Sequence, residues 1–199
     1  MHKGFSLVEL LIVIGIIAVL TGASIGGYAK FVKSAEKTKC QELVSNTATA
    51  LTALFTKEGA WPKALRTNGS TDGRLDENAA YALASYMSLT TSNGKLSGID
   101  RFGIVSPWAA QLIKRKGTSA SLSDKLGEGT LQDHILHYAL DLDGDGIIEG
   151  ASVGGESVDC RATAIVWCCG KDGKLESYSK GQRADDVYSW SRGQTQNVK

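Results

Sequence analysis

An apolar run near the N-terminus, residues 5–29, constrains this chain more than any other feature, and Glu9 is its only charged residue. As a helix, the run would extend about 37 Å, whereas the hydrocarbon core of a bilayer is about 30 Å thick. The run is therefore long enough to span a membrane. A carboxylate inside a membrane segment costs about 2.5–3.5 kcal/mol, so Glu9 is expected to have a dedicated partner.

Two ordinary interpretations of the run are open. It could be a cleaved secretory signal with removal near Ala23, or a simple membrane anchor that tolerates one acid. Against a secretory signal, the charged leader is very short and Glu9 lies within the apolar part.

The residues at the start of the run favour a third interpretation. Lys3-Gly4-Phe5-Ser6-Leu7-Val8-Glu9 closely resembles the class III signal of type IV pilins and type II secretion pseudopilins. The resemblance implies that a prepilin peptidase cuts after Gly4 and methylates the new N-terminal Phe5. It also implies that Glu9 sets the subunit register by pairing with the Phe5 amine of a neighbouring subunit.

One departure from the family concerns the helix after this motif. Many members have a proline at the position of Gly26, and this chain has none there. Three glycines would weaken the helix here in place of the proline, since each costs about 1 kcal/mol of helix stability relative to alanine. They are Gly22, Gly26 and Gly27.

The helix is predicted to continue beyond the apolar run, because apolar residues recur at steps of three and four up to Phe55. Gly59 and Pro62 then predict its end. We therefore expect a leader at residues 1–4, a long helix over 5–58 whose transmembrane segment is 5–29, and an exported globular domain over 59–199. The spaced positions on the second half of the helix are Cys40, Leu43, Val44, Thr47, Leu51, Leu54 and Phe55.

The charges do not favour the orientation that the resemblance implies. Lysines follow the apolar run at 30, 33, 37 and 39, and the positive-inside rule would place that side in the cytoplasm. The resemblance implies the reverse: a single-pass protein of the bacterial inner membrane with its globular domain in the periplasm, and a fibre in the periplasm or at the surface.

The remaining residues predict an α+β fold in which a small antiparallel β-sheet packs on the long helix. We expect a helix over 76–89 capped by Asp76, a turn at 92–95, and a helix after Ser106 and Pro107 that ends at Gly117. Alternating residues over 136–142 predict a half-buried strand, and 162–167 and 175–179 are further strand candidates. The four tryptophans are expected in the core.

Short motifs extend the family resemblance along the chain. Gly59-Ala60-Trp61-Pro62 looks like the Gly-x-Tyr-Pro element of the major pseudopilin of type II secretion, and Pro107-Trp108 is similar to part of its Asp-Pro-Trp-Gly segment. Residues 170–174 with Asp185, Asp186 and Trp190 are similar to its C-terminal calcium loop. The resemblance is absent from about 64 to 130.

Two acidic groups are candidate calcium sites. Asp141, Asp143 and Asp145 alternate before Gly146, as at the start of a calcium loop, and Glu149 stands at the ninth position. Position twelve is Ser152 instead of glutamate, so an acidic turn without an ion is the alternative. The second group consists of Asp172, Asp185 and Asp186.

The cysteines and histidines give weaker predictions. Cys40, Cys160, Cys168 and Cys169 fit no zinc spacing, and in an exported domain they would form one or two disulfides with the pairing left open. Cys168 and Cys169 are expected to have separate partners. We expect His134 and His137 to be surface or edge residues.

Composition and motifs exclude several functions. The chain has 22 basic and 21 acidic residues, which argues against nucleic acid as a partner. It has no phosphate-binding loop, and its Ser-x-x-Lys segments lack their partner motifs, so we expect no enzyme activity.

The expected function is a structural subunit of a type IV pilin-like fibre, with a type II secretion pseudopilin as the leading case. A type IV pilus subunit, or a membrane-tethered periplasmic binding or enzyme domain, are the alternatives. The implied partners are copies of the chain, minor pilins or pseudopilins, prepilin peptidase, an inner-membrane assembly platform and membrane lipid, with calcium as the cofactor.

Overall fold

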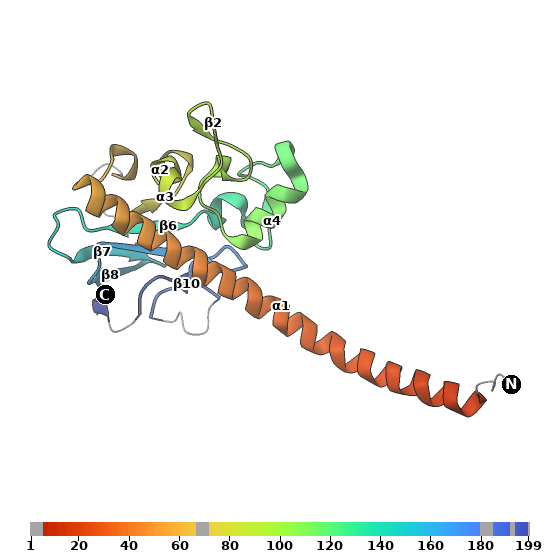
Figure 1. Cartoon of the computed structure of the whole chain (residues 1–199). Helices are drawn as coiled ribbons and strands as arrows, with labels where there is room; N and C mark the ends of the chain where they lie inside the picture. Colours follow the sequence, from red (N-terminus) through yellow and green to blue (C-terminus); the bar gives the residue numbers. More distant parts are fainter. Residues whose placement is uncertain (1–5, 67–71, 180–184, 192–193, 199) are drawn as a thin grey trace. The chain divides into compact units, whose positions relative to one another are not determined.

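The structure is a computed structural model of the 199-residue chain. It describes residues 6–66, 72–179, 185–191 and 194–198, and excludes the side chains of 23–30 and 196–198. The chain divides into two compact units, Met1–Glu36 and Lys37–Lys199. Helix α1 (Leu7–Glu58) contributes its first part to one unit and its last part to the other (Figure 1). The predicted helix over 5–58 is confirmed within the described residues.

The second unit is built on a four-stranded antiparallel sheet with the order β1-β6-β9-β10. Its central strands pair with His137 opposite Trp167 and Leu140 opposite Ala164. The strand bounds are β1 (Asp72–Arg74), β6 (His137–Leu140), β9 (Ala164–Cys168) and β10 (Val187–Tyr188).

A second sheet has three antiparallel strands in the order β11-β8-β7. Its strands are β7 (Ile148–Val153), β8 (Glu156–Cys160) and β11 (Thr195–Val198). The β7–β8 hairpin turns at Gly154 and Gly155, which have φ angles of +60° and +82° that favour glycine.

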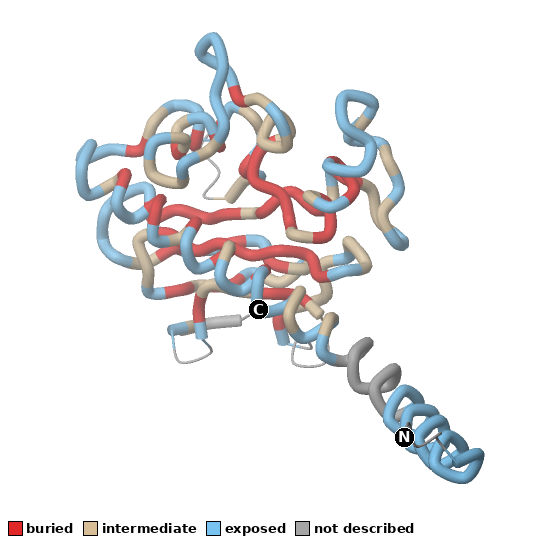
Figure 2. The backbone as a smooth tube through the Cα atoms, turned by 45° about the vertical axis from the view of Figure 1, so that its right-hand side comes forward, coloured by how far each residue is buried: buried red, intermediate tan, exposed pale blue. Residues whose placement is uncertain are grey.

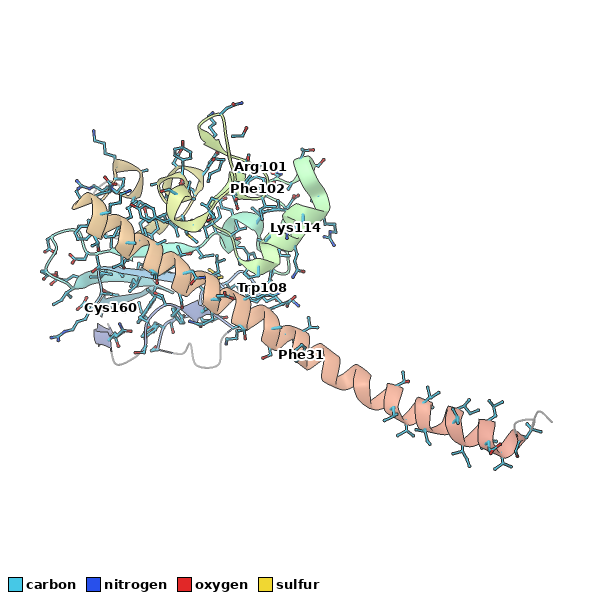
Figure 3. The ribbon with its side chains drawn as sticks, viewed as in Figure 1. Phe31, Arg101, Phe102, Trp108, Lys114 and Cys160 are labelled. Atoms are coloured by element: carbon cyan, nitrogen blue, oxygen red, sulfur yellow. The ribbon has the colours of Figure 1, made fainter. Side chains whose placement is uncertain are left out.

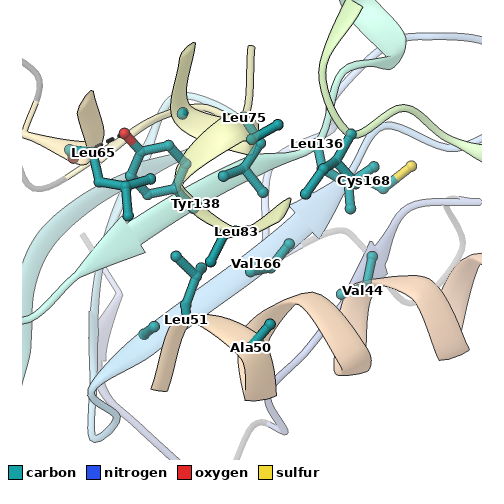
Figure 4. Packing of buried hydrophobic residues seen from close by; sticks show 14 of the residues in the cluster. Val44, Ala50, Leu51, Leu65, Leu75, Leu83, Leu136, Tyr138, Val166 and Cys168 are labelled. Carbon is teal, nitrogen blue, oxygen red and sulfur yellow. Dashed lines mark hydrogen bonds between the residues drawn. The ribbon is translucent and has the colours of Figure 1, made fainter. Parts of the chain in front are cut away.

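Two of the hydrophobic clusters in this unit lie between three layers, and a third lies around α4. The first lies between the last part of α1 and one face of the four-stranded sheet, where Leu51 and Val44 meet Tyr138 and Val166 (Figure 4). The second fills the space between the sheets, around Trp167. Figure 2 shows that buried residues concentrate in the strands of this unit. These layers confirm the α+β fold in which a long helix packs on an antiparallel sheet.

The central strands are more buried than predicted. Successive side chains of a strand point to opposite faces. On β6, Tyr138 and Leu140 belong to the helix-facing cluster, while Ala139 belongs to the cluster between the sheets. The strand predicted over 136–142 is present as β6, but the prediction that it is half-buried is wrong, because the second sheet covers the face that we expected to be solvated.

The predicted strand over 175–179 is also wrong. Backbone N–H groups there bind carboxylates instead of a neighbouring strand: that of Glu176 donates to Asp186 Oδ2 (3.0 Å), and that of Ser179 donates to Glu156 Oε2 (2.8 Å). Strand β10 occupies the edge of the four-stranded sheet. The sequence at 162–167 does form a strand, β9.

Small elements lie between β1 and β6. Asp76 caps α2, as predicted, by accepting from the Ala79 N–H (3.0 Å), but the predicted helix over 76–89 is split at Leu83. The helix α4 has the predicted Ser106 cap and ends at Gly117. The bounds are η1 (Lys63–Leu65), α2 (Glu77–Ala82), α3 (Ala84–Met87), β2 (Thr91–Ser92), β3 (Lys95–Leu96), η2 (Asp100–Phe102), α4 (Pro107–Lys116), η3 (Gly117–Ser119), β4 (Lys125–Leu126), β5 (Gly129–Thr130) and η4 (Leu131–His134).

Candidate functional site

The first turn of α1 is closed by its own side chains. The Val8 N–H donates to Ser6 Oγ (3.3 Å), and the Ser6 N–H donates to Glu9 Oε2 (2.9 Å). Ser6 is thus an N-cap whose hydroxyl oxygen accepts from the second N–H of the helix, and the Glu9 carboxylate accepts from the Ser6 N–H in return; such caps supply acceptors to N–H groups that lack partners within the helix. Gly4 and Phe5, the predicted cleavage and methylation residues, lie outside the described residues. The pairing of Glu9 with a neighbouring subunit stays a prediction.

The first part of α1 is apolar on all sides and exposed. Figure 3 shows its side chains projecting around the helix. Exposed fractions run from 46% at Val13 to 85% at Leu7, and Phe31 is 72% exposed. An ordinary amphipathic surface helix has one apolar stripe, so a helix that is apolar all round requires cover by lipid or by other helices.

Across the described residues, we find no helix with the length and apolarity needed to cross a membrane. Residue 5 and the side chains of 23–29, which belong to the predicted span over 5–29, lie outside the description.

The first predicted acidic group is brought together after β6. Carboxylate oxygens of Asp141, Asp143 and Asp145 lie within 4.8 Å of one another. Asp141 is only 2% exposed, and its carboxylate accepts from the N–H groups of Gly144 (2.7 Å) and Gly146 (2.8 Å). Gly146 has a φ of +84°, which suits the sharp turn that the motif predicts.

Glu149, the fourth predicted ligand, is not part of that three-carboxylate group. It lies on β7 and is exposed, and it lines with Asp143 a hollow of about 220 Å³. The loop thus offers three converging carboxylates and a fourth at the rim of an adjacent hollow. Carboxylate oxygens at this spacing are the ligands that calcium prefers.

The second acidic group differs from the prediction by one residue. Glu176, Asp185 and Asp186 converge within 4.8 Å, whereas Asp172 is not part of the group. The Asp172 carboxylate accepts from the Lys174 N–H (2.9 Å). Sequence reasoning missed Glu176 because it placed that residue on a strand, and no local spacing links it to residues 185 and 186.

Asp186 is the buried member of this second group. It is 5% exposed and accepts from the N–H groups of Gly170 (3.1 Å) and Glu176 (3.0 Å). Burial raises the pKa of Asp186 to about 7, and the nearby Glu176 carboxylate adds to this increase. Glu176 Oε2 is buried and has no hydrogen-bond partner in the part of the chain that the structure describes.

The four cysteines are buried thiols without a disulfide. The sequence predicted one or two disulfides, and the structure contains none among these residues. Burial raises the pKa of Cys160 to about 11 and that of Cys169 to about 12. A hydrogen bond with Cys40, together with burial, raises the pKa of Cys168. Protonated, buried thiols are poor nucleophiles.

One buried pair has the elements of a catalytic site but no access for a substrate. Ser106 Oγ lies 3.1 Å from His134 Nδ1, and both residues are 0% exposed. The hydroxyl oxygen also accepts from the Ala109 N–H (3.4 Å), so its role is to cap α4. The prediction that His134 is a surface or edge residue is wrong, because this last residue of η4 is fully buried against Ser106. The expected burial of Trp61, Trp108, Trp167 and Trp190 is confirmed.

Comparisons with known proteins support the interpretation of the N-terminus. Residues 1–25 match the model of the prokaryotic N-terminal methylation motif. Fimbrial protein EcpC of Eikenella corrodens is 24% identical over 119 residues, which cover 59% of this chain and 76% of that protein. The type IV major pilin protein PilE of Neisseria gonorrhoeae is 32% identical over 63 residues, 32% of this chain and 38% of its own length. No solved structure matches significantly.

Both relatives are named as pilin or fimbrial proteins, which agrees with a structural, non-enzymatic chain and does not support the narrower expectation of a type II secretion pseudopilin. The N-terminal segment of this chain therefore carries the prokaryotic N-terminal methylation motif, and over part of its length the chain is similar to type IV pilin and fimbrial proteins.

Proposed function

We propose that this chain is a structural subunit of a type IV pilus that polymerises through the first part of α1. The observation that carries the proposal is a helix that is apolar all round, with Leu7 85% exposed, and that begins within the N-terminal methylation motif. Lipid would cover this surface before assembly, and the helices of other subunits would cover it afterwards. The globular domain over 59–199 would be exported and form the outer surface of the fibre.

Glu9 has a specific place in this proposal. In the lone chain its carboxylate accepts from the Ser6 N–H, within its own first turn. Cleavage after Gly4 would create a charged amine at Phe5 on every subunit. A carboxylate in an apolar environment is stabilised by an opposite charge, so the amine of a neighbour would fix the axial position of Glu9.

Three variants test this role. Glu9→Ala removes both the cap and the charge, and Glu9→Gln keeps an oxygen that can accept from the Ser6 N–H. Glu42→Ala is the matched control, since Glu42 is an exposed acid further along α1. With prepilin peptidase present, we expect all three to be processed and only the Glu9 variants to yield few fibres in electron micrographs. Normal fibres from Glu9→Gln would refute the pairing role.

A pseudopilin of a type II secretion system is the second candidate. Its support is the Gly59-Ala60-Trp61-Pro62 element, whose Trp61 is buried and donates from Nε1 to the Asp141 carbonyl oxygen (2.5 Å). The pilin names of the relatives favour the pilus. A deletion strain distinguishes the two: loss of surface fibres with normal secretion supports the pilus, and the reverse supports the pseudopilin.

We also propose that the loop of Asp141, Asp143 and Asp145 binds calcium, because three carboxylates converge there around a glycine turn. The group of Glu176, Asp185 and Asp186 is the alternative, supported by the buried, unpartnered Glu176 Oε2 among the described residues. Calcium at 100 times its Kd would stabilise the fold by about 2.7 kcal/mol, and the melting temperature would rise by roughly 5–10 °C.

The choice between the two groups is testable with matched variants. Asp143→Asn and Asp185→Asn each remove one ligand charge. We expect calcium to raise the melting temperature of the wild type and of Asp185→Asn, but not that of Asp143→Asn. An unchanged melting temperature of the wild type after chelation would contradict calcium binding at either group.

A further inference from the structure

Two buried thiols meet where the last part of α1 packs on the four-stranded sheet. Cys40 lies on α1 and Cys168 ends β9, and both are 0% exposed members of the same hydrophobic cluster. Cys40 lies close enough to raise the pKa of the Cys168 thiol, whose Sγ donates to the Cys169 carbonyl oxygen (3.3 Å). Figure 4 shows Cys168 and Val44 as members of this cluster, and Val44 lies one turn after Cys40 along α1. A helix and a strand thus bring two thiols together in one buried cluster.

A neighbouring contact holds the helix at this end of the sheet. The side chain of Gln41 donates to the carbonyl oxygen of Tyr188 on β10 (2.9 Å). The adjacent residue, Val187, is paired with Cys168 across the two strands. The proximity of Cys40 to Cys168 therefore agrees with a second, independent contact between the same elements.

Neither Cys160 nor Cys169 is positioned to pair with Cys40 in place of Cys168. Cys160 lies on β8, in the cluster between the two sheets, where it is paired with Ile148 and Thr195. Cys169 directly follows Cys168, and successive residues of an extended chain point to opposite sides. The α1-facing position at the end of β9 therefore belongs to Cys168.

We infer that Cys40 and Cys168 form a disulfide in the exported protein and so bond α1 covalently to the four-stranded sheet. This inference rests on the proposed function, because export places the chain in an oxidising compartment. The two thiols lose two protons and two electrons. The electrons pass to the disulfide of a thiol–disulfide oxidoreductase, which forms a mixed disulfide with one cysteine and leaves as a dithiol.

Burial determines when the bond forms. Neither thiol is accessible in the folded unit, so the oxidant must act while α1 and β9 come together during folding. Once formed, the bond is protected from reductants by the same packing. It closes a loop of more than a hundred residues, and long loops give the largest stabilisation in the chain-entropy model. A fibre subunit would thus keep its domain attached when its helix is pulled.

Peptide mapping tests the pairing directly. Trypsin would release residues 40–57 with Cys40 and residues 162–171 with Cys168 and Cys169. We expect full-length protein from a periplasm-exporting host, alkylated before digestion, to give these peptides linked, about 2 Da lighter than their sum. The linked pair should persist in Cys169→Ala and vanish in Cys168→Ala and Cys40→Ala. The melting temperature of the wild type should fall by roughly 10 °C when it is unfolded, reduced and refolded with reductant.

A refolding experiment separates this inference from the proposed function. The full chain is unfolded, then refolded in detergent with oxidised and reduced glutathione, which requires no export. Absence of the linked peptides after refolding would overturn the inference, as would four alkylated thiols in protein whose N-terminus has been processed in the cell. If the chain is left unprocessed in a cell that contains prepilin peptidase, but forms the Cys40–Cys168 bond on refolding, the proposed function is contradicted and the inference is not.

Discussion

The substitution Leu51→Ala should distinguish the two roles of α1, in which its last part packs on the sheet and its first part is proposed to assemble the fibre. Leu51 is 0% exposed and packs in the cluster between the helix and the sheet, whereas Leu11 on the same helix is 66% exposed. Leucine and alanine have similar helix propensities, so a change to alanine at either position leaves the helix itself nearly unaffected. A fully buried Leu→Ala change costs about 2–5 kcal/mol from lost transfer energy and the cavity that remains.

We therefore expect Leu51→Ala to lower the free energy of unfolding by about 3 kcal/mol. For a domain of this size, that corresponds to a fall in melting temperature of roughly 6–12 °C. Leu11→Ala should leave the melting temperature unchanged within about 2 °C, because no transfer energy is lost at an exposed site. Circular dichroism of both variants in detergent, beside the wild type, measures the two shifts.

The fibre yield supplies the complementary measurement. We expect Leu11→Ala to reduce it and Leu51→Ala to form fibres below its melting temperature. Equal thermal shifts for the two variants would refute the reasoning, since they would mean that the burial of α1 does not differ between its first and last parts.

Three further predictions concern the second unit. Burial lowers the pKa of His137 to about 4; Arg74 adds to this effect, and Asp72 and Asp133 oppose it. The stability that this residue contributes should be complete above its unfolded pKa of about 6.5 and should fall by up to about 3 kcal/mol as the pH is lowered towards 4. In denaturant unfolding, His137→Gln should not show this loss, whereas the wild type should. Gly103→Ala should destabilise by about 3 kcal/mol, because φ is +96° and a Cβ would lie 2.1 Å from the Leu75 carbonyl oxygen, whereas Gly98→Ala, with open space at a φ of +63°, should cost only about 1 kcal/mol in urea titrations. Asp76→Ala removes the α2 cap and should lower the melting temperature by roughly 2–4 °C, and an unchanged value would show that the cap does not contribute.

Features with a local cause could be predicted from the sequence, and features that depend on distant contacts could not. The caps at Asp76 and Ser106 and the end of α4 at Gly117 follow from neighbouring residues. The same holds for the convergence of Asp141, Asp143 and Asp145 within one turn. The end of α1 at Glu58 is likewise local, because Gly59 and Pro62 follow it.

The errors arise where partners are far apart in sequence. The sequence around Glu176 predicts a strand, but the Glu176 N–H donates to Asp186 Oδ2 instead of to a neighbouring strand. Strand β6 reads as half-buried, because nothing in its own residues indicates that β7 and β8 will cover its second face. The proximity of Cys40 and Cys168 joins residues more than a hundred positions apart, and spacing alone left that pairing open.

Polar contacts as well as hydrophobic packing hold the last part of α1 on the four-stranded sheet. Besides the hydrophobic cluster, a polar contact fixes each end of the packed part: Gln41 bonds to Tyr188 at one end, and Trp61, just after the helix, bonds to the Asp141 carbonyl oxygen at the other. Hydrophobic packing alone does not select one position along a helix, because it has little directionality. The two directional bonds fix that position.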